Sequence, residues 1–319
     1  MELLKPFIFQ SYLKSVIWGG DNIARFKGIT TDQRFIGESW EISGVEGAES
    51  IVADGPDRGL TLPQLIEKYG AGLVGERCYR SYGRWFPLLI KIIDAHDDLS
   101  VQVHPDDTLA RHRHNCSGKS EMWYVIATEG DDPSINVGLT RPITRDDYER
   151  MAADGSLAEV IKRHRSHPGD VFYIPAGRIH SIGAGNLILE VQQASDITYR
   201  IFDYNRTDAY GNRRQLHVEL ARDAIDYTVL PSYTSEPEQL GAVSQQLVVS
   251  PYFVVRKLVV TEHIAADLSH RESFITMTCI EGAACVNGVQ VARGSSILVP
   301  AATHQLIIDG SATFITASL

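Results

Sequence analysis

Two turns flank a short apolar run in Gly169-Asp-Val-Phe-Tyr-Ile-Pro175-Ala-Gly-Arg-Ile-His180. The glycine and aspartate at its start favour a turn, and the β-forming residues 171–174 favour a strand. Pro175-Ala-Gly then redirects the chain, because proline and glycine favour turn geometry. His180 follows at the start of the next strand, from which its side chain can point into a barrel. The stretch therefore predicts β-structure with a histidine placed just after a turn.

A second histidine lies upstream, in Leu99-Ser-Val-Gln-Val-His-Pro105. Strict alternation puts Ser100, Gln102 and His104 on one face of a strand and the aliphatic residues on the other. Gln102 and His104 then lie about 7 Å apart along the strand. Burying an unpartnered polar face costs a few kcal/mol per group. The face is therefore either exposed to solvent or lines a functional site.

A third stretch, Lys119-Ser-Glu-Met-Trp-Tyr-Val-Ile126, has a carboxylate at the start of a strongly β-forming run. Glu121 can be read as a solvated strand end, but beside the two histidine stretches it completes a ligand set. Gln102, His104, Glu121 and His180 offer an amide oxygen, a carboxylate and two imidazoles around an open position, as a catalytic zinc site requires. The expected cofactor is one zinc ion per chain.

Two further histidines have a His-x-His spacing in Arg111-His-Arg-His-Asn-Cys-Ser-Gly118. No strand pattern surrounds them. We therefore interpret His112 and His114 as residues of a solvated loop, outside the metal site.

The overall charge excludes some partners. Thirty basic and forty acidic residues give a net charge of −10 at pH 7, so no broad positive field is available to hold nucleic acid or an anionic membrane. An anionic substrate must instead be held by a few local Lys and Arg residues. No apolar run is long enough to span a bilayer and residues 1–10 lack a leader pattern, which favours a cytoplasmic protein. The four cysteines have neither metal-knuckle spacing nor disulfide density and are expected to be reduced.

Most of the chain consists of short apolar or alternating runs separated by Gly, Pro, Asp and Asn, the pattern of an antiparallel sandwich or barrel. Helical patterns cover residues 61–69, 144–164 and 217–227. The polar stretch 231–241 has linker composition and marks a candidate domain boundary.

A weak internal sequence repeat supports that boundary. Residues 121–130 resemble 273–282 in hydrophobic pattern, and residues 169–180 resemble 294–304. Two related β-barrels would explain both pairs of similar segments, although chance similarity of short apolar strands would too. We predict a catalytic metal-binding domain at 1–235, with a helical insertion at about 144–165, and a C-terminal domain without a metal site at 236–319.

The stretch 169–180 has the form of the second signature of cupin barrels, and more of the chain resembles one cupin family. The type I mannose-6-phosphate isomerases, in their compact bacterial form, are similar over nearly the first 230 residues. The resembling segments are 17–20, 37–43, 87–105, 118–124, 175–183 and 192–204. The resemblance implies a mainly β fold of two cupin-type jelly-roll barrels, which are double-stranded β-helices, with a few helices inserted.

The same resemblance implies roles for individual residues. The family's ligand motif maps onto the four residues found above. Its active-site arginine corresponds to Arg200, and its basic pocket residues correspond to Lys91 and Lys119. Ser100 and Glu190, which alternates with Gln192 in the strand before Arg200, are expected to contact substrate. From the residues alone, Lys91 can equally be a structural lysine that snorkels to solvent, and Arg200 an ion-pair partner of Asp196 or Asp203.

The implied activity is zinc-dependent interconversion of mannose 6-phosphate and fructose 6-phosphate through an enediol. The implied partner is a small sugar phosphate, and the protein is expected to be a monomer or homodimer. Two other functions remain open. A non-catalytic sugar-binding cupin needs the pocket without the chemistry, and a cupin oxygenase binds iron(II) at a similar site, although an amide ligand such as Gln102 favours non-redox chemistry.

Overall fold

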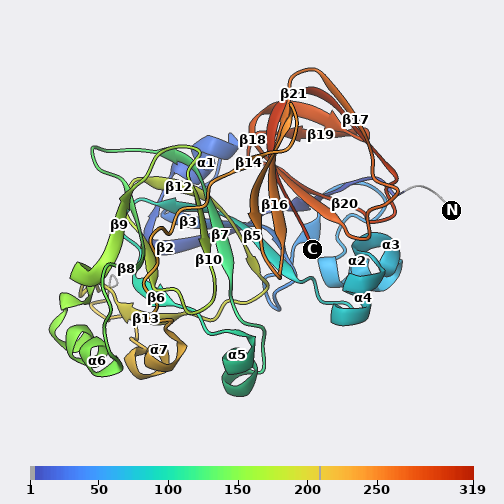
Figure 1. Ribbon diagram of the computed structural model, residues 1–319. Coiled ribbons are helices and arrows are strands. Elements are labelled where there is room, and N and C mark those ends of the chain that lie inside the picture. The colour runs from blue at the N-terminus through green and yellow to red at the C-terminus, as the bar shows by residue number, and fades with distance from the viewer. Residues whose placement is uncertain (1–3, 208–209) are drawn as a thin grey trace.

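The computed structural model describes residues 4–207 and 210–319 (Figure 1). This part of the chain is mainly antiparallel β-structure in three sheets, with short helices at the periphery. The mainly β fold expected from the sequence is therefore confirmed. No helix in these residues is long and apolar enough to cross a membrane.

The first sheet has six strands, and its two faces are both covered. Its order is β10 (Val171–Ile174), β7 (Glu121–Thr128), β12 (Asn186–Gln193), β5 (Leu88–Ala95), β3 (Ile36–Ser43) and β2 (Tyr12–Gly20).

A five-stranded sheet packs on one face of it. Its order is β13 (Tyr199–Phe202), β6 (Val101–Val103), β11 (His180–Ile182), β8 (Ser134–Leu139) and β9 (Ile161–Arg165). Apolar side chains of both sheets, among them Trp123, Ile135 and Ile182, form one core between them.

The third sheet has ten strands and comes mostly from the last third of the chain. Its main order is β14 (Glu238–Gln239), β15 (Ser244–Val249), β16 (Val254–Val260), β21 (Gln305–Ser318), β18 (Ile275–Val286), β20 (Ser296–Val299), β1 (Phe7–Gln10) and β4 (Ile51–Val52), while β17 (His263–Asp267) pairs with β21 and β19 (Val289–Ala292) with β18. It encloses a separate core that includes Met277, Ile297 and Phe314. Because β1 pairs with β20, the start of the chain also belongs to this sheet.

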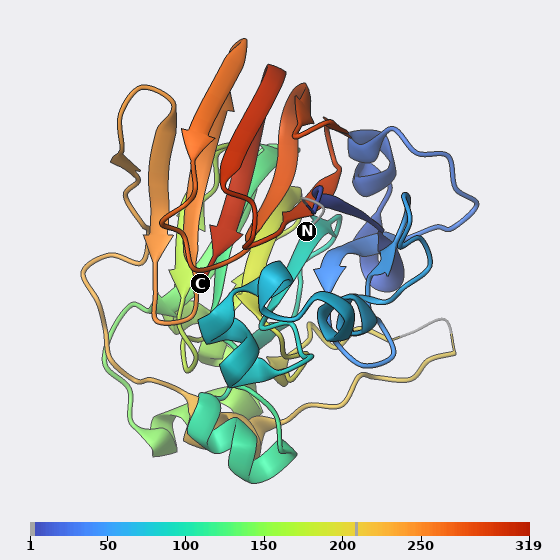
Figure 2. The ribbon, with the colours of Figure 1, turned by 90° about the vertical axis from the view of Figure 1, so that its right-hand side faces the viewer.

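The helices lie outside the sheets (Figures 1 and 2). The set is α1 (Asn22–Lys27), α2 (Leu62–Tyr69), α3 (Ala71–Val74), α4 (Glu76–Tyr82), α5 (Asp107–His114), α6 (Arg145–Asp154), the 3-10 helix η1 (Ser156–Val160) and α7 (Val218–Ala224). The helices α6 and α7, with η1, cover the outer face of the five-stranded sheet through residues such as Tyr148, Leu157 and Ala221.

The local predictions have mixed outcomes. The helix predicted at 61–69 is α2, with a capping box between Thr61 and Gln64, and the helix predicted at 217–227 is α7. The helix predicted at 144–164 is wrong at its end, because residues 161–165 pair with β8 as a strand. The predicted linker 231–241 contains β14, and its Tyr233 is buried, with the hydroxyl hydrogen-bonded to Leu139.

The loop predicted for His112 and His114 is wrong as well. Both residues belong to α5, which begins with the Asp106 side chain accepting a hydrogen bond from the Leu109 amide and ends at Asn115 in the left-handed region. This helix has two adjacent apolar residues, Leu109 and Ala110, and otherwise polar ones, so its sequence has no hydrophobic periodicity and its cap residues were the available signal.

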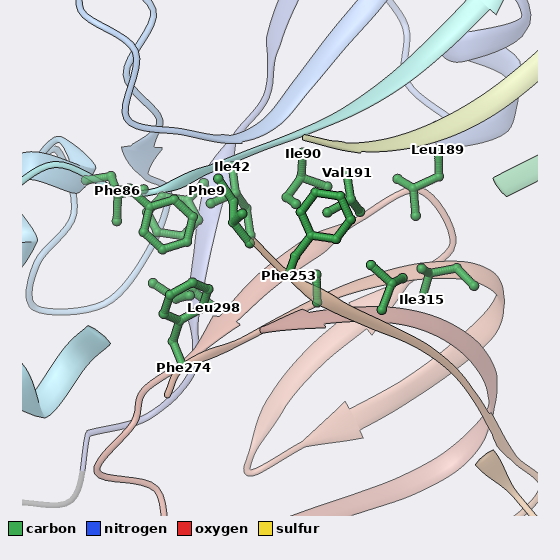
Figure 3. Close-up of a cluster of buried hydrophobic side chains, with 14 of the residues drawn as sticks. Phe9, Ile42, Phe86, Ile90, Leu189, Val191, Phe253, Phe274, Leu298 and Ile315 are labelled. Atoms are coloured by element: carbon green, nitrogen blue, oxygen red, sulfur yellow. The ribbon is translucent and has the colours of Figure 1, made fainter. Parts of the chain in front are cut away.

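The other face of the six-stranded sheet packs on the ten-stranded sheet. Figure 3 shows Ile42, Ile90, Leu189 and Val191 from the first sheet above Phe253, Leu298 and Ile315 from the other. Phe86 and Phe274 meet across the same interface, with ring centroids 4.6 Å apart. This contact buries the outer face of the central strands of the six-stranded sheet.

Alternation along the strands therefore decides which residues face the barrel interior. On β12, Leu187, Leu189 and Val191 point to the interface, so Glu190 and Gln192 point inward. On β5 the interface residues are 88, 90 and 92, and Lys91 points inward. The buried six-stranded sheet thus carries a polar inner surface.

Replacing Phe253 by alanine tests the interface. Its ring is 1% exposed and lies between the two sheets, so the cavity left behind should lower the free energy of unfolding by about 3–5 kcal/mol. Urea denaturation measures this. Val249→Ala, at a side chain 59% exposed, is the control and should cost less than about 1 kcal/mol. Equal losses in the two variants would show that the interface contributes little.

Candidate metal centre

His104, Glu121 and His180 meet at one end of the barrel between the six- and five-stranded sheets. Their ligand atoms all lie within 4.8 Å of one another, and the residues are at most 1% exposed. Oε1 of Glu121 is 3.2 Å from Nε2 of His180, and Oε2 is 3.4 Å from Nε2 of His104. Three of the four predicted ligands therefore form one buried cluster, which we call the triad.

Strand pairing brings these distant residues together. Glu121 opens β7, opposite Ile174 of β10 and Gln192 of β12. His180 opens β11 and pairs with Gln102 of β6, two residues before His104. The turn between β10 and β11 is fixed by the Gly177 amide, which donates to the His104 carbonyl at 2.8 Å. The turn and strand starts predicted for residues 169–180 are confirmed.

Backbone carbonyls orient both imidazoles. Nδ1 of His104 donates to the carbonyl of Ile197 at 2.9 Å, and Nδ1 of His180 donates to that of Arg178 at 2.8 Å. With the proton on Nδ1, the lone pair of each Nε2 points to the centre of the triad. This is the arrangement in which protein histidines bind metals.

Three buried atoms of the triad have no hydrogen-bond partner in the structure. They are Nε2 of His104 and both carboxylate oxygens of Glu121. Leaving buried acceptors unpaired costs about 1–3 kcal/mol each, more for a charged group. These atoms all offer lone pairs and lie close together. A cation placed between them could interact with all three at once. The residues present therefore fit a divalent metal ion.

The protonation states agree with this fit. Burial, assisted by the charge of Lys119, lowers the pKa of His104 to about 3, and burial likewise lowers the pKa of His180. Burial raises the pKa of the Glu121 carboxyl, but Lys119 and the two imidazoles outweigh it and hold the pKa well below its usual range. At neutral pH the triad has two neutral imidazoles and a carboxylate, which are the forms that bind metals.

Gln102 lies at the edge of the triad. Its side-chain Nε2 is 3.3 Å from Nε2 of His180, and its Oε1 accepts from the Ser100 hydroxyl at 3.5 Å. A half-turn of the amide would exchange the two atoms and place the oxygen beside His180. The fourth predicted ligand is therefore within reach of the centre.

Two buried lysines stand beside the triad on the polar inner surface. Nζ of Lys119 is 3.2 Å from Oε2 of Glu121. Nζ of Lys91 is 3.4 Å from Glu190 and 3.5 Å from Glu38, and it lies 4.8 Å from the centre of the Trp40 ring. Burial lowers the pKa of Lys91, but Glu38 and Glu190 outweigh this and raise it. Lys91 is thus a buried paired ammonium and does not snorkel to solvent.

The pKa of Glu190 is shifted in the opposite direction to the pKa values of Glu38 and Glu121. Burial and the nearby charge of Glu121 raise its pKa, although Lys91 opposes them. The indole nitrogen of Trp123 donates to its Oε1 at 3.0 Å, whereas Oε2 has no hydrogen-bond partner.

Arg200 lies on β13, where its backbone pairs with that of Gln102 on β6. Its Nε donates to the Ser100 hydroxyl at 3.2 Å. Asp203 pairs with Arg206 and Arg214, and Asp196 with Lys14, so neither is the ion-pair partner that the sequence left open for Arg200. Burial and the charge of Arg214 lower the pKa of Arg200. Its guanidinium therefore lacks a carboxylate within 4.0 Å in the described residues.

The histidines of α5 stay outside the triad, as the sequence analysis expected. His112 is exposed, and His114 bonds through Nε2 to the hydroxyl of Tyr199 at 2.7 Å. Sequence reasoning missed Glu38 as the partner of Lys91. The pairing of β3 with β5 that brings them together spans some 50 residues of chain and leaves no local signal.

Comparisons with known proteins agree with this geometry. A model of the type I phosphomannose isomerase catalytic domain matches residues 7–142, and a model of the mannose-6-phosphate isomerase cupin domain matches residues 244–319. The chain is 35% identical to mannose-6-phosphate isomerase ManA of Bacillus subtilis over 99% of both chains, and 31% identical to a mannose-6-phosphate isomerase of Streptococcus mutans over 99% of this chain and 98% of that one.

A crystal structure of the mannose 6-phosphate isomerase from Bacillus subtilis superposes with a TM-score of 0.89 at 30% identity, covering 99% of this chain and 100% of the other. The similarity thus covers the full length at more than 30% identity, includes both domain models and extends to the overall fold. The chain belongs to the type I phosphomannose isomerase family.

Proposed function

We propose that this protein is a zinc-dependent isomerase that interconverts mannose 6-phosphate and fructose 6-phosphate. The substrate is inferred from the family to which the chain belongs, and the metal is inferred from the triad. The observation that carries it is the set of converging acceptor atoms on His104 and Glu121 that have no hydrogen-bond partner among the described residues.

The donor set favours zinc among the divalent ions. Imidazole nitrogens with a carboxylate, and an amide oxygen from Gln102, suit a non-redox ion with an open coordination position. When bound, zinc would supply a fixed positive charge that stabilises negative charge developing on the sugar oxygens.

The protein's own groups supply the remaining requirements. Isomerisation moves a proton between two carbons through an enediol, so it needs proton transfer, charge stabilisation and a grip on the phosphate. We assign Arg200 to the substrate's negative charge, because its guanidinium is half-buried and lacks a carboxylate partner in the described residues. Ser100, bonded to it, would orient that guanidinium and contact the sugar.

Lys119, Lys91 and Glu190 form the floor of the proposed pocket. Lys119 lies closest to the triad and would contact the sugar or move a proton there. Lys91 and Glu190 pair with each other, and the raised pKa of Glu190 suits a carboxyl that exchanges a proton.

We further propose that residues 1–235 form the catalytic domain and residues 236–319 a C-terminal domain without a metal. In residues 4–207 and 210–319 the triad is the one group of three or more metal-ligating side chains that the structure brings together. His304, the counterpart of His180, is exposed, and Ser273 stands where the first barrel has Glu121.

A coupled assay of fructose 6-phosphate formation from mannose 6-phosphate tests the activity. Turnover supports the proposal. Sugar binding without turnover would instead favour the non-catalytic alternative.

Removing the metal should abolish turnover, and restoring zinc should return it. His104→Ala and His180→Ala should lose metal and activity together, because each removes a ligand of the triad. His112→Ala, at an exposed histidine of α5, is the matched control and should lose neither. Metal analysis beside the assay measures both. Full activity in metal-free protein, or normal metal content in His180→Ala, would contradict the ligand assignment.

Arg200→Ala should keep its metal and fold while turnover falls by ~10²–10³-fold, the usual effect of deleting a charge-stabilising donor. Steady-state kinetics, metal analysis and thermal unfolding separate these effects. Arg150→Ala on α6, whose side chain is 63% exposed, is the control for loss of an arginine. If Arg200→Ala loses its metal, the residue is structural instead.

Purified protein should hold one zinc per chain, and His304→Ala should leave that number unchanged. A single exposed imidazole beside a serine cannot replace the three or four ligands that zinc needs. Elemental analysis against protein concentration checks this. Two equivalents per chain, with one lost in His304→Ala, would contradict the division into one metal-binding and one metal-free barrel.

A further inference from the structure

A cavity of about 540 Å³ lies at one end of the ten-stranded sheet, where helix α4 meets the C-terminal barrel. Its lining includes Arg256 on β16, Arg271 in the segment before β18, and Arg77 on α4. Its volume is within the usual range for pockets that bind small molecules. None of the triad or the proposed pocket residues lines it.

The internal repeat relates this cavity to the metal end of the first barrel. The strand order β16-β21-β18-β20 repeats the order β5-β12-β7-β10 of the six-stranded sheet. The shift that aligns Glu121 with Ser273 is 273 − 121 = 152, and it aligns Lys119 with Arg271. Arg256 lies on the counterpart of β5, the strand that carries Lys91. The second barrel thus has cations at this end and a serine, Ser273, where the first has the carboxylate of Glu121.

The three arginines have no ion-pair partner among the described residues. No carboxylate oxygen lies within 4.0 Å of the guanidinium nitrogens of Arg77, Arg256 or Arg271 in that part of the chain. Nε of Arg256 is buried without a hydrogen-bond partner, and Arg271 donates to the hydroxyl of Ser318 at 2.6 Å. Burial and the charge of Arg256 lower the pKa of Arg271. Two mutually repelling cations are therefore held near each other without a direct ion pair to either one in the described residues.

Close backbone contacts join the helices beside the cavity to the C-terminal barrel. The amides of Ala301 and Ala302 donate to the carbonyls of Leu73 and Gly72, both at 2.9 Å, which ties α3 to the C-terminal barrel. The turn at Gly75, with φ of 92°, leaves no room for a side chain, because a Cβ there would lie 2.0 Å from the carbonyl oxygen of Glu272. The backbone segments that carry Arg77 and Arg271 are therefore in direct contact.

We propose that this cavity binds the phosphate group of a small phosphorylated polyol, as an anion site separate from the metal centre. Guanidinium groups bind phosphate oxygens through paired charged hydrogen bonds, and a phosphate here would relieve the repulsion between Arg256 and Arg271. Asp267 and Glu272 also line the cavity without pairing with the arginines, and their carboxylates can accept hydrogen bonds from ligand hydroxyls. The inference does not depend on the proposed isomerase activity.

Equilibrium dialysis with radiolabelled inorganic phosphate tests the site on the full chain. The double variant Arg256→Gln, Arg271→Gln should bind one phosphate fewer per chain than the unchanged protein, while kcat for isomerisation stays the same. Glycerol 3-phosphate should displace this phosphate and glycerol should not. An unchanged phosphate count in the folded double variant, or displacement by glycerol, would overturn the proposal.

A milder variant covers the case in which the double variant does not fold. Arg77 is exposed on α4, so Arg77→Gln should fold normally and weaken phosphate binding at this site by roughly fivefold. Arg80→Gln, three residues along the same helix and 81% exposed, removes the same charge outside the cavity and should change binding little. Equal weakening by the two substitutions would show a general charge effect and contradict a defined site.

Discussion

The double burial of the six-stranded sheet is the constraint on which the rest of this structure depends. One face packs on the ten-stranded sheet through aliphatic and aromatic side chains, and the opposite face lines the barrel interior. Since successive residues of a strand point to opposite faces, every interface residue on β5 and β12 fixes the direction of its neighbours. Lys91, Glu190 and Gln192 are buried in the interior as a consequence of the apolar contact behind them.

Burying charged groups is costly unless they are paired, and the barrel interior meets that cost in two ways. Around Lys91 two carboxylates, Glu38 and Glu190, lie within ion-pair distance of the ammonium. Around Glu121, in the part of the chain that the structure describes, only Lys119 is within ion-pair distance among the cations, and both carboxylate oxygens and Nε2 of His104 have no hydrogen-bond partner. These converging acceptor atoms are the feature that fits the triad to a metal ion, whereas the acids around Lys91 face an ammonium.

The two barrels show how the same strand order can support different chemistry. The first has a carboxylate and two imidazoles at one end, and the second has two arginines and a serine in the corresponding region. The second barrel also contributes to the first, since Phe253 and Ile315 cover the outer face of its sheet. Strand β1 and helix α3, both early in the chain, bond in turn to the C-terminal sheet or its loops. The N-terminal and C-terminal parts of the chain are therefore packed and hydrogen-bonded to each other.

The sequence alone determined much of this protein, because its decisive signals are local. Turn residues and alternation around 169–180 predicted two strands and their turn, and the residue types at 104, 121 and 180 predicted a metal site. Helix α2 was visible from its capping residues. Local signals failed where they were absent or overridden. Helix α5 has only two adjacent apolar residues and no repeating apolar pattern, and residues 161–165 form a strand because β8 offers a partner.

Only the tertiary structure decided how the polar residues pair. That Lys91 is bound by Glu38 and Glu190, that Arg200 rests on Ser100 without a carboxylate partner, and that Arg256 faces a cavity beside Arg271 all follow from strand pairing between distant segments. Alternation tells which face of a strand a residue occupies. Alternation does not tell which strand pairs with a given strand, because that pairing depends on how the whole sheet is buried between the two sheets that pack on it.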